Sequence, residues 1–262
     1  MDQAKVLAGD YGTVASTIPV VTSTIPAFNA VAITKDRVSF IALNLPLIMG
    51  LGPANNALFN LIDSLGELPP ILPEWLWPRR HKKRIQELRQ QHNRIMLWLN
   101  NPTTELPFSF AEKSLQAEHP MVHIQVLFIL LHELAHFKAG HIQVAETGNA
   151  EECNPVYGLP STHRQELEAD DIAMTWLMGL KKGFVMNGVA VPAEVAEDLI
   201  GHAITFLFYC FAILEALGSI GTRGLSETHP PAFMRWALLC TSLPEHQQKS
   251  LGRLISHVGR LT

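Results

Sequence analysis

The sequence predicts a single α+β domain in which helices predominate and a small β element lies near the N-terminus. The 262-residue chain is 47% hydrophobic and only 17% charged, which is typical of a globular protein with a sizeable core. Residues rich in Val, Thr and Ile are concentrated between positions 18 and 44, where they favour strands. Most of the remaining chain carries helical patterns or apolar runs bounded by proline, which favours helices.

The β element is expected in two segments, residues 18–34 and 38–44, linked as a hairpin through Lys35–Arg37. A helix is expected over residues 45–65, with an interruption at its Gly-Pro pair. The proline cluster at residues 68–78 then predicts a linker or a rigid loop.

The second part of the chain is expected to be helical. Residues 79–100 carry apolar side chains at helical spacing and predict an amphipathic helix. Further helices are expected from about residue 119, over residues 162–181, after Pro192 and after Pro230, with a loop at 147–161. We therefore expect one domain over residues 1–262, with an N-terminal β and helical part (1–100) and a helical part (105–262).

Charge and cysteine content narrow the functional classes. A net charge of −4 indicates neither a nucleic-acid partner nor an anionic membrane surface. The three cysteines are far apart, odd in number and form no CxxC pair, so we expect a reducing compartment and no disulfide framework. No charged segment followed by an apolar one opens the chain, so we expect a cytoplasmic protein. The cysteines are Cys153, Cys210 and Cys240.

Two segments allow other interpretations. The basic run Arg79–Arg84 could contact nucleic acid, but no second basic patch or aromatic platform accompanies it, so we expect a solvated helix start. Residues 203–221 are long and apolar enough to cross a membrane, yet they contain Glu215. We expect a buried helix there, with membrane association left open.

The segment "LLHELAHFKAGH", residues 130–141, contains an HExxH pattern. His132 and His136 lie about one helical turn apart, so their imidazoles can bind the same ion. Glu133 cannot bind alongside them but can reach a metal-bound water as a base. His141 has the wrong spacing for a third ligand, because on a continuing helix it lies about 180° from His132. It is expected to close the helix or to line the rim of the site after Gly140.

A third ligand is available in "RQELEADDIAMTW". Glu166 and Asp170 lie on one helical face, whereas Glu168 points almost opposite to them. Glu166 can bind the metal, and Asp170 can accept the N–H of a ligand histidine and hold its tautomer. The alternative interpretation is an ordinary acidic helix start.

HExxH followed by ExxAD resembles the gluzincin metallopeptidases, in particular the CAAX prenyl endopeptidases and HtpX-type heat-shock proteases. The resemblance covers about residues 119–240 and implies a zincin-like metallopeptidase domain. It also implies zinc binding by His132, His136 and Glu166, with Glu133 as the general base and Asp170 as a support for the ligands.

A third element of that family, an HPP sequence followed by an arginine, is present as "THPPAFMRW". The resemblance implies that His229 steadies the oxyanion or the substrate backbone and that Arg235 supports the site. The segment 142–165 is mostly polar, which favours a soluble relative. The sequence is also similar to the soluble Lit-type phage-exclusion peptidases, and both relationships stay open.

The leading hypothesis is a metalloendopeptidase with one Zn²⁺ per chain that acts on a protein or peptide and binds no nucleic acid. Its oligomeric state is not assigned. The alternative is a non-catalytic zinc-binding scaffold or sensor that binds a protein partner, although a structural zinc site needs no base such as Glu133. The proline-rich loop at 68–78, with Trp75 and Trp77, is a candidate lid.

Overall fold

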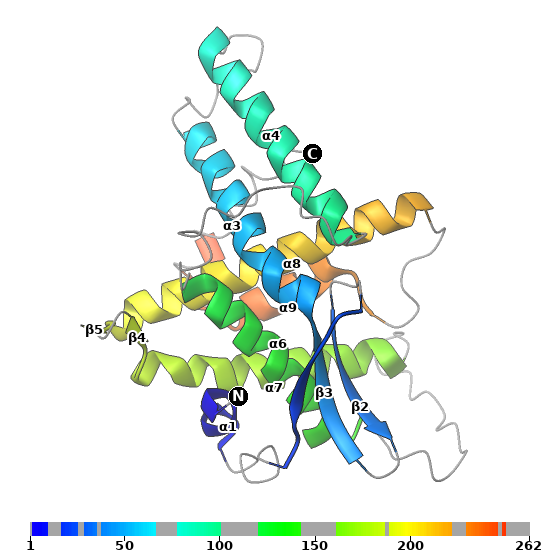
Figure 1. Cartoon of the computed structure of the whole chain (residues 1–262). Coiled ribbons are helices and arrows are strands. Elements are labelled where there is room, and N and C mark those ends of the chain that lie inside the picture. Colours follow the sequence, from blue (N-terminus) through cyan, green and yellow to red (C-terminus); the bar gives the residue numbers. More distant parts are fainter. Residues whose placement is uncertain are drawn as a thin grey trace.

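The structure is a computed structural model that describes residues 2–9, 17–25, 29–35, 38–66, 78–100, 120–142, 161–186, 189–221, 229–245 and 248–249. Nearly all of the expected loops at 68–78 and 147–161 lie outside these ranges, as do Trp75, Trp77 and Cys153. The described fold is mostly helical with a small N-terminal sheet, which confirms the expected α+β class (Figure 1).

The sheet has three strands in the order β1-β3-β2. Strands β2 (Ala30–Lys35) and β3 (Val38–Asn44) pair antiparallel, as the expected hairpin requires. Strand β1 (Val20–Ser23) pairs with β3 in parallel, which the hairpin pattern did not predict. The second half of β3 is buried, and strands β2 and β3 both contact helix α6.

Helix α3 (Leu45–Gly66) follows β3 directly and packs along α4 (Arg79–Asn100) (Figure 1). The expected interruption of α3 is wrong, because the helix continues through Pro53. A proline inside a helix removes one backbone hydrogen bond, and packing on neighbouring helices offsets that loss. At Gly50 the two helices approach closely, since a β-carbon there would overlap the Leu99 side chain.

Helix α6 (Pro120–Lys138) is the central element, with contacts to α3, α7 (Ser161–Met178), α8 (Ala193–Gly221) and the sheet. Its residues are buried on nearly every side, as its continuous apolar run predicts. The largest fully buried side chains near its centre include Phe128 with Phe206 and Phe208 of α8. This packing gives the C-terminal turns of α6 a rigid base.

The remaining elements complete the helical layer. Helix α9 (Ala232–Thr241) packs on α8 and α7. A 3-10 turn (Gly179–Lys182) and the hairpin of β4 (Val185–Met186) and β5 (Val189–Ala190) follow α7, away from the three-stranded sheet in Figure 1. The short helix α1 (Asp2–Leu7) also contacts α6, and neither it nor the β4–β5 hairpin was expected from the sequence.

Two helices, α6 and residues 193–215 of α8, are long and apolar enough to cross a membrane. Two thirds of the apolar window of α6 and half of that of α8 are buried inside the protein. Core helices of soluble proteins pass the same test, so length and composition alone carry little weight here.

Candidate metal centre

Three side chains from two helices meet at one point. His132 and His136 project from α6, and Glu166 projects from α7, with one ligand atom of each within 4.8 Å of the others. The two histidine Nε2 atoms are 3.1 Å apart. Glu166 Oε2 lies 3.4 Å from His132 Nε2, and Glu166 Oε1 lies 3.3 Å from His136 Nε2. Such a cluster could hold a metal ion.

The spacing of these atoms fits a small divalent cation. Ligand atoms placed about 2.0–2.1 Å from a tetrahedral ion are separated from one another by about 3.3 Å. The two histidine Nε2 atoms are separated by 3.1 Å, and each lies 3.3–3.4 Å from a different oxygen of Glu166, so the separations are close to that value. Glu166 Oε2 is also buried and, among the described residues, has no hydrogen-bond partner. Two imidazole nitrogens and one carboxylate are a donor set that leaves a fourth position open.

Asp170 supports the cluster from one turn further along α7. Its Oδ1 lies 2.9 Å from Nδ1 of His132, the ring nitrogen that faces away from the other ligand atoms. Arg235 of α9 donates two hydrogen bonds to Asp170, from Nε to Oδ2 and from Nη2 to Oδ1, both at 2.7 Å. This bidentate pairing joins α9 to α7 and fixes the carboxylate that orients His132.

The charged side chains of the cluster shift one another's pKa values. Burial alone would lower the pKa of His132, but the adjacent carboxylates of Asp170 and Glu166 outweigh it and raise the pKa to about 9. Burial alone would raise the pKa of both carboxyls. The two histidines hold the pKa of Glu166 well below its usual range, and Arg235 lowers that of Asp170. Both carboxylates are therefore charged near neutral pH.

Glu133 lies beside the cluster and faces the sheet. Burial raises the pKa of its carboxyl group, against the opposing effects of His132, His136 and the nearby backbone of Ala32 in β2. It lines a cavity of about 290 Å³ together with His132 and Glu166. The apolar wall of this cavity comes from α3, α6 and α8 and consists of Leu47, Phe128, Ile129, Phe211 and Leu214.

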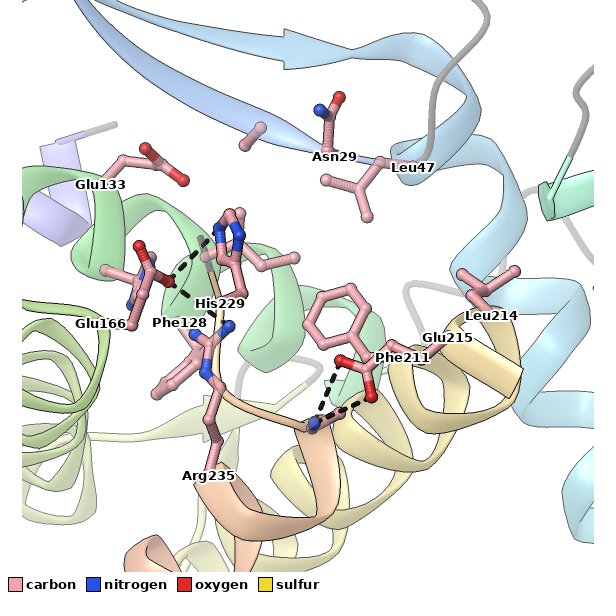
Figure 2. Close-up of a pocket in the computed structure, with 14 residues that line it drawn as sticks. Asn29, Leu47, Phe128, Glu133, Glu166, Phe211, Leu214, Glu215, His229 and Arg235 are labelled. Carbon is pink, nitrogen blue, oxygen red and sulfur yellow. Dashed lines mark hydrogen bonds and ion pairs between the residues drawn. The ribbon is translucent and has the colours of Figure 1, made fainter. Parts of the chain in front are cut away.

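The start of α9 forms another wall of the cavity. His229 Nε2 and Arg235 Nη1 each lie 3.5 Å from Glu166 Oε2, and Figure 2 shows both side chains facing that carboxylate. Both carboxylate oxygens of Glu215 accept the N–H of Ala232 at 3.0 Å. The N-cap residue Pro231 provides no side-chain hydrogen bond, so Glu215 of α8 caps α9 from outside.

His141 and Glu168 lie next to the cluster but outside it. Nδ1 of His141 is 3.0 Å from Nδ1 of His136, and Nε2 of His141 is 3.1 Å from Glu168 Oε2. The expectation that neither residue joins the three ligand atoms agrees with this arrangement. The geometric reason given for His141 was wrong, because α6 ends at Lys138 and does not continue to His141.

Comparison with known proteins identifies the family. A profile of the peptidase U49 family matches residues 81–254, more than half of the chain. The chain belongs to the peptidase U49 family. No curated protein and no solved structure matches it.

Membership of the peptidase U49 family supports a proteolytic function with a peptide or protein substrate. All seven residues singled out from the motifs lie at this site: His132, Glu133, His136, Glu166, Asp170, His229 and Arg235. The HExxH, ExxAD and HPP motifs do not contain the lining residues from distant parts of the chain, namely Asn29, Ala30, Leu47, Phe211 and Leu214. Glu215 had one signal, namely a carboxylate inside an apolar run.

The basic run at the start of α4 consists mainly of exposed side chains. Lys83 lies 3.9 Å from Glu87 one turn along the same helix. These features fit the solvated helix start that was expected there.

Proposed function

We propose that this member of the peptidase U49 family is a zinc-dependent metalloendopeptidase with a zincin-like catalytic domain. The observation that carries the proposal is the convergence of His132, His136 and Glu166, with one ligand atom of each within 4.8 Å of the others, beside the carboxylate of Glu133. A purely structural zinc site closes with a fourth protein ligand, whereas this donor set has three and opens into a cavity.

Zinc would supply two effects at this position: it would lower the pKa of a coordinated water toward neutrality and polarise the carbonyl of the scissile peptide. Glu133 accepts the proton of the attacking water and delivers it to the leaving nitrogen. Burial raises the pKa of Glu133, which brings this carboxylate closer to the range of an effective base near neutral pH. Apolar side chains around the cavity limit access of bulk water.

His229 and Arg235 assist at the opposite wall from the sheet. The His229 ring is partly exposed at the cavity, where its N–H can donate to the oxyanion that forms on the substrate. Arg235 holds Asp170 and lies 3.5 Å from Glu166, so it positions two of the side chains that form the centre. We assign His229 a catalytic role and Arg235 a positioning role.

The edge of the sheet supports a peptide substrate. In the described sheet β2 is an edge strand, and the N–H of Asn44 donates to the carbonyl of Asn29. Because hydrogen-bonded pairs alternate along an antiparallel ladder, the backbone groups of Ala30 and Ala32 point away from β3. Ala32 reaches Glu133 on that side, so an extended peptide paired there would pass the proposed metal.

The experiment is metal analysis of the purified chain combined with an unbiased cleavage assay. We expect one zinc per chain in the wild type and in Glu133→Gln, and loss of zinc in Glu166→Ala. A proteome-derived peptide mixture, read by mass spectrometry, should show new termini with the wild type. Glu133→Gln should reduce their rate of formation by about 10²–10⁴-fold, since a general base contributes that much.

Unchanged cleavage by Glu133→Gln would refute the assigned base. A wild type without stoichiometric metal would refute the metal centre. Stoichiometric zinc without any cleavage would overturn the proposal in favour of a non-catalytic zinc-binding scaffold.

A further inference from the structure

The chain folds back sharply at the end of the helix that carries the two clustered histidines. Gly140 has a φ of 73°, the left-handed conformation that glycine adopts without strain. The N–H of His141 donates to the carbonyl of His136 at 3.0 Å, and the N–H of Gly140 donates to that of Phe137 at 3.2 Å. These two bonds form a Schellman motif, which turns the chain back over the last helical turn. The motif brings the side chain of His141 beside that of His136.

The two ring nitrogens of His136 face different partners. Nε2 faces His132 Nε2 and Glu166 Oε1 in the cluster, whereas Nδ1 faces Nδ1 of His141. A neutral imidazole that binds a cation through Nε2 carries its proton on Nδ1, so Nδ1 must find an acceptor. The lone pair on Nδ1 of His141 can be that acceptor.

One arrangement of protons then satisfies every contact along this path. Nδ1 of His141 accepts from His136 only if the proton of His141 resides on Nε2. That Nε2–H faces Glu168 Oε2 at 3.1 Å, and a carboxylate is an acceptor only. The hydrogen bonds therefore run in one direction, from His136 through His141 to Glu168.

The other clustered histidine has a direct counterpart of this arrangement. Nδ1 of His132 faces a carboxylate, Asp170, at 2.9 Å. Among the described residues, no carboxylate contacts Nδ1 of His136, and this nitrogen reaches Glu168 through the intervening imidazole. We propose that His141 and Glu168 form a hydrogen-bonded relay that fixes the tautomer and ring orientation of His136 as a metal ligand. This inference rests on the proposed metal centre.

The geometry also defines what His141 is not. It lies on the Nδ1 side of His136, opposite the nitrogen that faces the cluster, so it acts as a positioning residue and not as a ligand. The His141 side chain is 7% exposed, whereas that of Glu168 is 54% exposed. Solvent screens the Glu168 carboxylate, so we expect His141 to contribute more than Glu168 to metal affinity.

The test measures zinc affinity by chelator competition in four single variants. His141→Ala should weaken zinc binding by about 10–100-fold, the usual effect of losing a hydrogen-bond partner of a ligand histidine. His141→Asn should lose less, because its amide oxygen takes the position of Nδ1 and can still accept from Nδ1–H of His136. Glu168→Ala should also lose less than His141→Ala. Asp171→Ala is the matched control, because it removes an exposed carboxylate from the same helix, and it should bind zinc as the wild type does.

A second measurement reads the tautomers directly. Long-range ¹H–¹⁵N spectra of the zinc-loaded wild type should place the His136 proton on Nδ1 and the His141 proton on Nε2. Either a His141 proton on Nδ1 or a zinc affinity of His141→Ala within about twofold of wild type would overturn the relay. If His141→Ala does not fold, the same comparison is made with His141→Asn and Glu168→Ala.

The two proposals fail in different ways. A wild type that binds no zinc overturns both the proposed function and the relay. If the wild type binds zinc and the His141 and Glu168 variants bind it with the affinity of the wild type, only the relay is overturned.

Discussion

The Asp170→Asn substitution is expected to destabilise the metal-free protein without changing the shape of the side chain. Asp170 is 1% exposed, accepts two hydrogen bonds from Arg235 at 2.7 Å, and lies 2.9 Å from Nδ1 of His132. An asparagine places an NH2 group at one of the two oxygen positions, where it faces an N–H donor. Arg235 also loses the charge that compensates its burial.

The magnitude follows from these contacts. Removing one partner of a buried ion pair costs about 3–5 kcal/mol in the free energy of unfolding. Arg235 retains Glu166 at 3.5 Å, so the lower end of that range, about 3 kcal/mol, is expected. At about 2–4 °C per kcal/mol for a chain of this size, the Tm should fall by about 6–12 °C. Zinc affinity should also fall by about 10–100-fold, because His132 loses the acceptor that orients it.

The assay is urea and thermal denaturation in the presence of a chelator, followed by zinc competition on the same samples. Asp171→Asn is the control: it changes the exposed neighbour of Asp170 and should stay within about 0.5 kcal/mol of wild type. A Tm of Asp170→Asn within about 2 °C of wild type would show that the buried contacts contribute little and would refute this reasoning.

Three further predictions concern other parts of the molecule. Gly50→Ala should destabilise the protein by about 1–3 kcal/mol, because the new β-carbon would overlap the Leu99 side chain where α3 meets α4. Gly52→Ala is the control: the nearest described atom lies 3.9 Å from its β-carbon, so it should be neutral or stabilising by up to about 1 kcal/mol. Equal urea midpoints for the two variants would contradict this prediction. Burial lowers the pKa of His92 below 6.5, so its neutral ring contributes stability that is lost as pH falls below 6.5. In the wild type this decline in unfolding free energy can reach about 1.4 kcal/mol per pH unit between about pH 6.5 and 5.5. His92→Leu should therefore make the decline shallower. An unchanged dependence of unfolding free energy on pH would argue against a neutral buried ring. Glu215→Ala removes the acceptor of the Ala232 N–H and should lower the free energy of unfolding by about 0.5–2 kcal/mol. Amide hydrogen exchange at the start of α9 should become faster, and unaltered exchange there would exclude the capping role.

Local patterns in the sequence anticipated much of the secondary structure. The helical spacing of apolar residues predicted α4, helix start and stop signals predicted α6, α7, α8 and α9, and the β-branched segments predicted the β2–β3 hairpin. These succeeded because periodicity and turn residues act over a few positions. One local prediction that failed was the interruption of α3, where packing overrides the effect of Pro53. Helix α1, the β4–β5 hairpin and the parallel pairing of β1 with β3 were not predicted.

The same local reasoning predicted the residues of the candidate site within each helix. Spacings of four residues place His132 near His136 and Glu166 near Asp170 once each segment is helical. The sequence by itself therefore determined which side chains share a helical face. It could not determine which faces meet, because that depends on how whole helices pack.

Only the tertiary structure decided the contacts between distant segments. The packing of α7 on α6 brings Glu166 to the histidines, and α9 supplies Arg235 to Asp170 from 65 positions away. Glu215, the edge of β2 and the turn at Gly140 enter the site in the same way. His141 shows the difference most clearly. The spacing argument assumed that α6 continues to His141, whereas the reversal of the chain after α6 places His141 beside Nδ1 of His136. Long-range contacts are selected by burial of the whole core, a property that no short segment contains.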